Sequence, residues 1–212
     1  MPRTAGSRNA DYDTTRAALL TRLHHALMQT DGVRLSFRQM ADAAGVSPTT
    51  LRHYFQSREQ VVAEVLAAAH RAGLPYLHAV ATQPTEALRP SLRWFLDYLV
   101  QGWRAGVGSV HALGLSEGIG HMSLGPAYLH EILEPSLQAA ETRLARHVAA
   151  GDLGPCDVRQ AAIELVGPVL VALLHQDVLG GTRCRPLDIR TFCEEHLDRF
   201  VRAFGAGAQT AL

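Results

Sequence analysis

Apolar residues recur along this chain every three or four positions, which is the spacing of one face of an α-helix. Between Thr14 and Thr30, for example, Leu20, Leu23 and Leu27 fall on one such face. The same spacing predicts further helices over 84–104, 126–150, 158–179 and 188–204. No stretch alternates with the period of two that marks a half-buried strand. The pattern therefore predicts an all-α fold of about nine helices, with a small N-terminal part and a larger body.

Proline and glycine mark the places where this helical pattern is expected to break. Pro75 is predicted to interrupt one helix and Gly167-Pro168 to kink another, because proline lacks a backbone N–H and its ring crowds the preceding turn. The stretch 102–125 contains seven glycines, so it is predicted to be the least regular part of the chain.

Residues 36–55 predict two short helices joined by a three-residue turn. Ser36 and Gln39 stand at the spacing of a capping box, and Gly45 suits the positive φ that ends a helix. The pair Ser47-Pro48 suits the cap and first position of the second helix. Small and polar residues face outward from that helix, as entry into the major groove of DNA requires. The arrangement predicts a helix-turn-helix, although an ordinary helical hairpin would show the same pattern.

Composition narrows the possible functions. The 212 residues carry 20 basic and 20 acidic side chains, every basic one being arginine, and 47% are hydrophobic, as in a globular protein with a core. Residues 1–60 hold eight arginines against five acidic residues, a mild hint of a polyanionic partner. No uninterrupted apolar run reaches the roughly 18 residues of a membrane span. Three cysteines and a polar N-terminus without a signal sequence predict a cytoplasmic protein with no membrane partner.

Two weak enzyme motifs are present. Gly114–Gly118 has the form G-x-S-x-G, but this nucleophile elbow requires a preceding strand in a parallel sheet, which the pattern does not predict. His130 and Glu131 begin an H-E-x-x-H zinc motif, but Glu134 stands where the second histidine is needed. We therefore expect no catalytic residues, no metal site and no cofactor.

The stretch from Ser36 to Leu66, SFRQMADAAGVSPTTLRHYFQSREQVVAEVL, resembles the N-terminal domain of TetR-family transcriptional regulators. The resemblance is carried by the turn 41–47, Leu51, the Tyr54-Phe55 pair and the helix start 57–59. It implies a DNA-binding domain over 1–60, with its motif at 36–55, and a ligand-binding and dimerisation domain over 61–212. It also implies a homodimeric regulator of transcription, usually a repressor that a small-molecule effector releases from a near-palindromic double-stranded DNA operator.

The same resemblance assigns DNA contacts residue by residue. It implies base contacts from Thr49, Thr50, Arg52 and His53, with Gln39 as a helper. It implies phosphate contacts from Ser36, Arg38, Ser47, Tyr54 and Arg58, and Pro48 belongs to the same predicted DNA-binding set. Tyr54 is alternatively a core residue. Arg58 replaces the usual lysine of the family, and Arg52 replaces the usual tyrosine, so Arg52 can hold a phosphate or recognise a guanine.

The resemblance also implies roles for the body of the chain. The last two long helices would form the dimer interface, through Leu165, Val166, Val169, Leu173, Phe192, His196 and Phe200. The middle helices would enclose the effector, through Trp94, Tyr98, Trp103, His111, Met122 and Tyr128. The scarcity of charge there favours a largely apolar, neutral ligand. The alternatives are that these side chains only form core, and that the chain is a helical small-molecule-binding or interaction protein without a DNA function.

Overall fold

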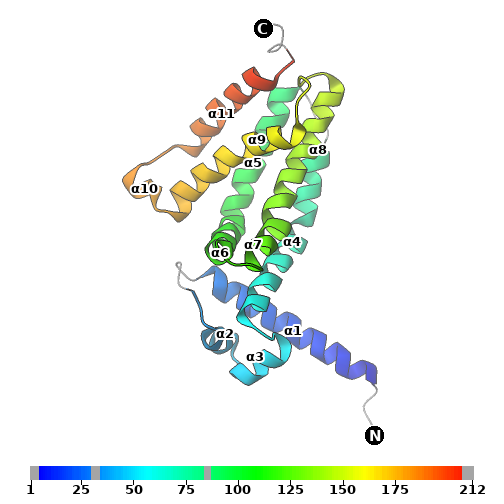
Figure 1. The fold of residues 1–212 in the computed structure, drawn as a ribbon, viewed down its shortest axis with the longest axis vertical. Helices are drawn as coiled ribbons and strands as arrows, with labels where there is room; N and C mark the ends of the chain where they lie inside the picture. Colours follow the sequence, from blue (N-terminus) through cyan, green and yellow to red (C-terminus); the bar gives the residue numbers. More distant parts are fainter. Residues whose placement is uncertain (1–4, 30–33, 84–86, 207–212) are drawn as a thin grey trace. The chain divides into compact units, whose positions relative to one another are not determined.

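The computed structural model describes residues 5–29, 34–83 and 87–206, and these are helical almost throughout (Figure 1). The chain begins with α1 (Ala5–Met28), α2 (Phe37–Ala44), α3 (Pro48–Tyr54) and α4 (Arg58–Thr82). Its middle forms α5 (Leu88–Gly102), the π-helical turn η1 (Trp103–Val107), α6 (Gly108–Gly118), α7 (Leu124–Tyr128) and a second π-helical turn, η2 (Leu129–Leu133). Its last part forms α8 (Glu134–Ala150), α9 (Val158–Leu173), η3 (Leu174–Val178), α10 (Gly181–Cys184) and α11 (Ile189–Phe204). The all-α prediction is confirmed, and the described residues form no strand beyond an isolated bridge between Leu153 and Gly205.

The chain folds into two compact units, which are best described separately. Unit 1 comprises residues 1–71 and 113–131, and unit 2 comprises residues 72–112 and 132–212. Helices α4 and α6 therefore each contribute residues to both units. The predicted division into a DNA-binding domain over 1–60 and a second domain over 61–212 is a division by function, whereas these units are defined by contacts. That functional division stays a prediction.

Unit 1 is built on the buried faces of its first four helices. Leu23 of α1, Met40 of α2 and Leu51 of α3 are fully buried, together with Phe55, which follows α3. Gly45 ends α2 in the left-handed region, at φ 71° and ψ 32°, and its N–H bonds back to carbonyl groups of α2. The predicted turn is therefore confirmed, and the packing of α3 on its inner side leaves its outer side exposed to solvent.

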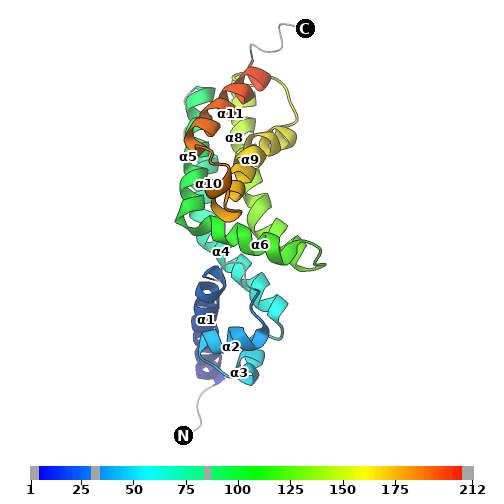
Figure 2. The ribbon, with the colours of Figure 1, turned by 90° about the vertical axis from the view of Figure 1, so that its left-hand side faces the viewer.

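Unit 2 packs its long helices around one apolar core (Figure 2). Helix α8 packs along α9, and α11 packs against both α5 and α9. Leucine, valine and alanine side chains fill most of this core, with Phe95 from α5 and Phe200 from α11. Asp157 caps α9 as predicted, and Asp188 caps α11, each accepting hydrogen bonds from backbone N–H groups of the first turn.

Proline and glycine interrupt the helices less than the sequence predicts. Helix α4 runs through Pro75 for 25 residues, so the predicted interruption there is wrong. Tertiary packing commonly outweighs one missing N–H. Helix α9 also continues through Pro168, and the kink predicted there stays a prediction. The glycine-rich stretch 102–125 is also largely helical, and its clearest departure is in η1, where Gly106 adopts φ 123°. Only glycine adopts that conformation readily.

One stretch of unit 2, Val158–Val178, is long and apolar enough to cross a membrane by length and composition alone. It has 21 residues and a mean hydropathy of 1.5, although polar residues interrupt it. In the structure 44% of its apolar window is buried, so one face of the helix lies in the core. The other face exposes Ile163, Val171 and Val178.

Candidate nucleic-acid interface

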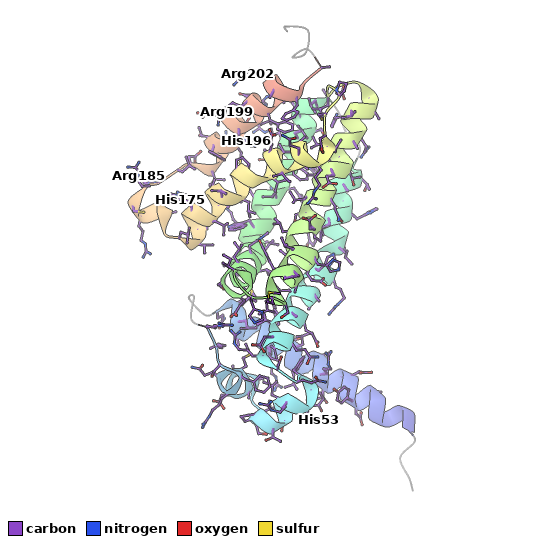
Figure 3. All side chains as sticks on the ribbon, viewed as in Figure 1. His53, His175, Arg185, His196, Arg199 and Arg202 are labelled. Atoms are coloured by element: carbon purple, nitrogen blue, oxygen red, sulfur yellow. The ribbon has the colours of Figure 1, made fainter. Side chains whose placement is uncertain are left out.

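Helix α3 is short, capped and exposed on one side. Ser47 Oγ accepts a hydrogen bond from the Thr50 N–H at 3.0 Å, and Pro48 occupies the first helical position. Leu51 is fully buried on the inner side. The predicted base-contacting residues of this helix are all exposed, namely Thr49, Thr50, Arg52 and His53. Figure 3 labels His53 among them. The structure therefore places these four side chains on one solvent-exposed side of α3.

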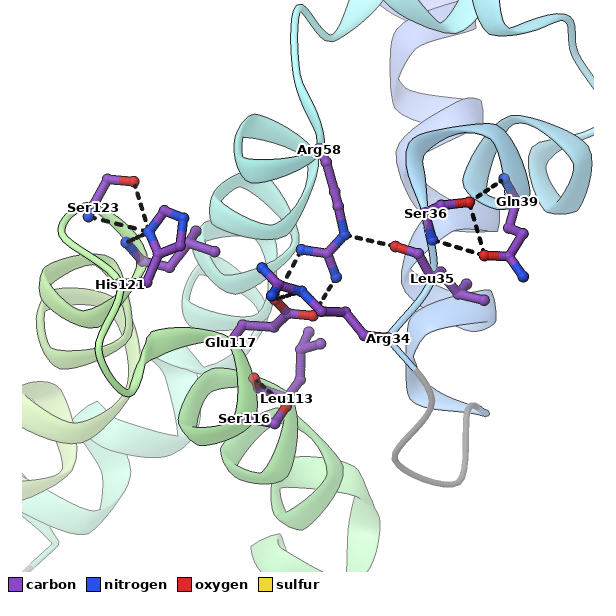
Figure 4. A network of polar contacts seen from close by, with 11 residues as sticks. Arg34, Leu35, Ser36, Gln39, Arg58, Leu113, Ser116, Glu117, His121 and Ser123 are labelled. Atoms are coloured by element: carbon purple, nitrogen blue, oxygen red, sulfur yellow. Dashed lines mark hydrogen bonds and ion pairs between the residues drawn. The ribbon is translucent and has the colours of Figure 1, made fainter.

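The start of α2 presents a second group of predicted contacts (Figure 4). The Gln39 N–H donates to Ser36 Oγ at 3.3 Å, and the Ser36 N–H donates to Gln39 Oε1 at 2.9 Å, which confirms the capping box. The Gln39 side chain is thus engaged at the helix start, whereas Arg38 beside it is exposed. A helix N-terminus with a neighbouring cation suits a phosphate group.

An aromatic cluster holds the C-terminal end of α3. Half-buried Tyr54 stacks on Tyr12 of α1, with ring centroids 4.8 Å apart, and meets the His53 ring edge-on at 5.0 Å. Tyr54 is therefore at least partly a packing residue, as the alternative interpretation holds. Sequence reasoning missed Tyr12, because it contacts residues of α3 about forty positions away, and no local spacing indicates such a contact.

Arg52 lies over the ring of Phe37, with its guanidinium carbon 5.2 Å from the ring centroid. Phe37 is the first residue of α2, so this contact places Arg52 on the flank of α3 that faces the start of α2. Both roles for Arg52 stay predictions. The contact favours the phosphate role, because backbone contacts cluster at helix N-termini while base contacts come from the groove-facing side.

Arg58, the first residue of α4, is bound inside unit 1 (Figure 4). Its Nε donates to the Leu35 carbonyl at 2.6 Å, its Nη1 donates to Glu117 Oε2 at 2.8 Å, and its Nη2 donates to Glu117 Oε1. Exposed Arg34 adds an ion pair, with its Nε 3.1 Å from Glu117 Oε2. Only 12% of the Arg58 side chain and 4% of the Glu117 side chain are exposed. Arg58 thus ties the starts of α2 and α4 to the end of α6, and its predicted phosphate contact would require it to leave this pair.

The Glu117 carboxylate is kept charged by its partners. Burial alone would raise its pKa, but hydrogen bonds and charge from Arg58, with the charge of Arg34, outweigh burial and hold the pKa below its ordinary value. Sequence reasoning did not select Glu117, which lies 59 residues from Arg58. The available signal is that Glu117 is the only carboxylate between residues 105 and 130.

Four of the predicted effector-binding residues lie in unit 2, in two separate pairs. Trp94 and Tyr98 stack with ring centroids 5.1 Å apart, and Trp103 stacks on His111 at 5.4 Å. The Trp103 and His111 side chains are buried, and the Trp103 Nε1–H donates to Asp177 Oδ2 at 2.9 Å. Burial lowers the pKa of His111 to about 4, so its imidazole is neutral at physiological pH.

The other two predicted effector-binding residues lie in unit 1. Met122 is 93% exposed. Tyr128 is buried, and burial raises its pKa to about 12. Its ring packs so closely on Gly114 that a Cβ added there would lie 2.1 Å from a ring carbon. Within unit 1, Tyr128 is therefore a packing residue of α6 and α7, and the effector-binding role of all six residues stays a prediction.

Most of the predicted dimer-interface residues point into unit 2. Those on α9 are at most 2% exposed, namely Leu165, Val166, Val169 and Leu173. Phe200 of α11 is 4% exposed and belongs to the same core. These side chains pack within their own subunit, and their role in a dimer interface stays a prediction.

Phe192 and His196 lie closer to the surface of α11. Both are half-buried, and their ring centroids lie 6.1 Å apart in a stacked arrangement. The His196 Nε2–H donates to the Leu165 carbonyl at 2.9 Å. Figure 3 labels His196 on α11. They sit beside α9, whose exposed side carries Ile163 and Val171. Phe192 and His196 thus lie nearer the surface than the other predicted interface residues, and their role in a dimer also stays a prediction.

The two enzyme motifs find no support in the described structure. Ser116 lies within α6, where its Oγ donates to the Leu113 carbonyl at 3.0 Å, so Gly114–Gly118 is a helical segment and not an elbow after a strand. The parts of the chain that the structure describes contain no group of three or more histidine, cysteine or acidic side chains that could hold a metal ion.

Residues 25–65 match the model of the family described as bacterial regulatory proteins, tetR family. No curated protein sequence matches the chain. Among solved structures, one similar to this chain is described as a TetR-family transcriptional regulator from Mesorhizobium loti MAFF303099, with a TM-score of 0.74 and 16% identity over 96% of this chain and 100% of that one.

Two further structures share the fold at similar distance. SmeT, the repressor of the Stenotrophomonas maltophilia multidrug efflux pump SmeDEF, has a TM-score of 0.63 and 17% identity over 90% of each chain. The flavonoid-responsive regulator FrrA has a TM-score of 0.67 and 21% identity over 91% of this chain and 98% of its own. At these identities the likeness shows the fold, while the N-terminal match confirms the resemblance carried by residues 36–66.

Proposed function

Because residues 25–65 match the model of the bacterial regulatory proteins of the tetR family, we propose that this chain regulates transcription by binding a specific DNA site. The observation that carries the proposal is the exposed side of α3, with Thr49, Thr50, Arg52 and His53. A capped helix of seven residues with small or polar outward side chains can enter the major groove and present them to base edges. Arg38, at the start of α2, would hold the DNA backbone beside it.

We place a second copy of the chain against the exposed apolar side of α9 and η3. Ile163, Val171 and Val178 are 46%, 65% and 42% exposed, and they recur about every two helical turns. Such a row on one helix face favours contact with another protein. A two-fold dimer would present two α3 helices to half-sites about one turn of the duplex apart, so we expect a near-palindromic operator.

The direction of control is inferred from the fold relatives. SmeT is described as a repressor and FrrA as flavonoid-responsive. We therefore propose that this chain represses transcription from its site and that a small molecule bound in unit 2 releases it. The competing interpretation is a helical binding or interaction protein without a DNA function, and it predicts no sequence-dependent DNA binding.

An electrophoretic shift assay with the DNA upstream of the protein's own gene separates these two interpretations. We expect the full chain to shift this DNA in preference to scrambled DNA, and Thr49→Ala and Arg52→Ala to weaken binding. The matched control is Arg202→Ala, an exposed arginine of α11 that should change nothing (Figure 3). Equal shifts of operator and scrambled DNA would refute the proposal.

Selection of preferred sites by the Arg52→Ala protein then assigns the role of Arg52. If Arg52 reads guanine, the loss of about 1–3 kcal/mol is confined to sites with that base pair, and preference relaxes there alone. If Arg52 holds a phosphate, all sequences lose affinity alike, and Arg52→Tyr restores much of it. The contact with Phe37 leads us to expect the second result.

Light scattering on Val171→Glu tests the dimer. Val171 is exposed within its subunit, so the fold should survive while the apposed interface buries an unpaired charge and separates. The matched control is Ala145→Glu, at an exposed position of α8. Phe200 is unsuitable for this test because its side chain is in the core. A Val171→Glu protein that stays dimeric would place the interface elsewhere.

A further inference from the structure

Arg143 of α8 is a fully buried cation, with 1% of its surface exposed. Its Nε donates to the Val80 carbonyl at 2.9 Å, and its Nη1 donates to Ser91 Oγ at 2.6 Å and lies 3.5 Å from the Ser91 carbonyl oxygen. Its Nη2 is also buried, and it has no hydrogen-bond partner among the residues that the structure describes. The guanidinium therefore retains one unused donor group inside unit 2.

The charge of Arg143 is not balanced by a carboxylate. Every acceptor that it contacts is a neutral carbonyl or hydroxyl oxygen, and in the described ranges no acidic side chain forms an ion pair with it. Burial, and then the charge of Arg146, lowers its pKa, yet a guanidinium stays protonated at any physiological pH. A buried charge without a counter-charge is costly to maintain, so an anion that reached it would be strongly favoured.

A chain of hydrogen bonds fixes the position of this guanidinium. Ser91 Oγ, which accepts from Arg143, lies 2.8 Å from His147 Nε2, and His147 Nδ1 lies 2.9 Å from Asp152 Oδ2. With the Nδ1 proton directed at the carboxylate, the Ser91 hydroxyl donates to Nε2 and keeps its lone pair for Arg143. The sequence of Ser91, His147 and Asp152 resembles a Ser-His-Asp catalytic triad. Ser91 is only 5% exposed, however, and its hydroxyl already donates to His147 and accepts from Arg143. The chain therefore orients Arg143 and does not activate a nucleophile.

Three aromatic rings extend from the Arg143 guanidinium to exposed positions. The Trp94 ring lies 4.9 Å from the guanidinium carbon, and Trp94 is itself 36% exposed, so one ring separates the charge from the surface. Tyr98 stacks on Trp94, and the ring centroids of Tyr98 and Tyr76 lie 6.1 Å apart. Tyr76 is 63% exposed. Planar apolar groups stack well on such a row, at little cost in conformational freedom.

We propose that unit 2 binds an aromatic monocarboxylate, whose carboxylate pairs with Nη2 of Arg143 and whose ring packs among Trp94, Tyr98 and Tyr76. Trp94 turns aside to admit it, because its ring covers the guanidinium. The proposal names the class of effector for the regulator proposed above and rests on that function only for the consequence of binding. It differs from the neutral ligand that the scarcity of charge in 102–125 predicts, because the deciding charge lies on α8.

Calorimetric titration of the full chain with 2-naphthoate and with its neutral isostere 2-naphthamide tests the site without DNA. We expect saturable binding of the acid, at least about tenfold tighter than that of the amide. Arg143→Met should remove this preference for the acid. Arg146→Met is the matched control, because Arg146 lies one turn further along α8 and bonds only to carbonyl groups of the α4 end, and it should bind like the wild type.

Other outcomes overturn the assignment. Absence of saturable acid binding, equal affinity for acid and amide, or unchanged selectivity in Arg143→Met would each do so. If Arg143→Met does not fold, Arg143→Lys, which keeps the charge but loses the planar fork, should still bind the acid more weakly than the wild type. Trp94→Ala should weaken acid and amide alike. Acid-selective binding by a protein that binds no operator would retain this site and refute the proposed function.

Discussion

Arg58 in unit 1 is largely buried, with 12% of its side chain exposed, and Arg143 in unit 2 is fully buried, but among the described residues only the charge of Arg58 is balanced by a carboxylate. Arg58 shares a buried carboxylate, that of Glu117, and also bonds to the Leu35 carbonyl. Arg143 contacts neutral oxygens and one aromatic face. A paired cation holds two segments together, and its binding capacity is used up. A cation without a counter-charge keeps that capacity, so the difference separates a structural tie from a ligand site.

The comparison also changes the role expected of Arg58. Its partners lie on the α1–α2 connection and at the end of α6, so it sets how the start of α4 meets the helix-turn-helix. A guanidinium in such a pair cannot also hold a phosphate. We therefore expect it to support DNA binding by positioning the helices, while exposed Arg38 contacts the phosphate itself.

The largest effect is expected from Arg58→Met. The change leaves Glu117 buried with Arg34, which is 59% exposed, as its remaining ion-pair partner. Breaking a buried pair by removing one member costs about 3–5 kcal/mol, and we expect the free energy of unfolding to fall by an amount in that range. Urea unfolding followed by circular dichroism measures the loss.

The double variant Arg58→Met, Glu117→Met supplies the control, because it removes both charges and leaves no isolated ion. It should be more stable than either single variant, and the cycle gives the coupling energy directly. Single variants that each cost less than about 1 kcal/mol would mean that the pair behaves as an exposed one, and the contrast with Arg143 would then fail.

The next effect is a difference in acid sensitivity between the two units. The pKa of buried His111 in unit 2 is lowered to about 4, so between pH 6.5 and 4 the unfolded state takes up a proton that the folded state does not. Stability is then lost as pH falls through this window, by at most about 3 kcal/mol. The pKa of Glu117 in unit 1 is also lowered, but from 4.5, so its contribution is lost only as pH falls below that value.

Denaturant unfolding at pH 7.5, 5.5 and 4.5 tests this difference. The buried Trp103 stacks on His111, so its fluorescence should report the early loss in unit 2. In His111→Gln, the free energy of unfolding should change little between pH 6.5 and 4.5. If His111→Gln loses as much unfolding free energy over this pH range as the wild type, another group is responsible for the loss.

A smaller effect is expected from Arg143→Met. The change removes a charge that has no carboxylate, so it leaves no buried anion behind, only the carbonyl of Val80 and the hydroxyl of Ser91 without a donor. We expect a loss of about 1–2 kcal/mol, clearly below that of Arg58→Met. Equal losses in the two variants would show that Arg143 is a structural tie as well, and would weaken its assignment as a ligand site.

Features that depend on neighbours in sequence were predictable, and features that depend on packing were not. The Ser36 capping box, the Gly45 turn and the Asp157 cap each involve residues within a few positions, and all are confirmed. The partners Arg58 and Glu117 are 59 residues apart, and Arg143 and Ser91 are 52 apart, so no periodicity could indicate them.

Helix α9 shows why periodicity alone could not tell a core-facing side from an exposed side. It is apolar on nearly all sides, with buried Leu165 and exposed Val171 both fitting a helical stripe. Periodicity defines a face only when the opposite face is polar. Which side of α9 lies in the core is therefore known from the fold and not from the pattern, and the partner on the other side stays a proposal.

The smallest expected effect is on the salt dependence of DNA binding, which should differ between exposed Arg38 and paired Arg58. A cation that contacts a phosphate releases about one counterion on binding, so Arg38→Ala should reduce the slope of log affinity against log salt by about one unit, with little change in sequence preference. Arg58→Met should weaken DNA binding but leave the salt slope unchanged, because the Arg58 guanidinium is already paired with the Glu117 carboxylate. Arg202→Ala should change neither quantity. Affinities measured across a series of salt concentrations decide the matter. An equal fall in slope for Arg38→Ala and Arg58→Met would mean that Arg58 leaves Glu117 to hold a phosphate, and its pairing would then be a feature of the DNA-free protein alone.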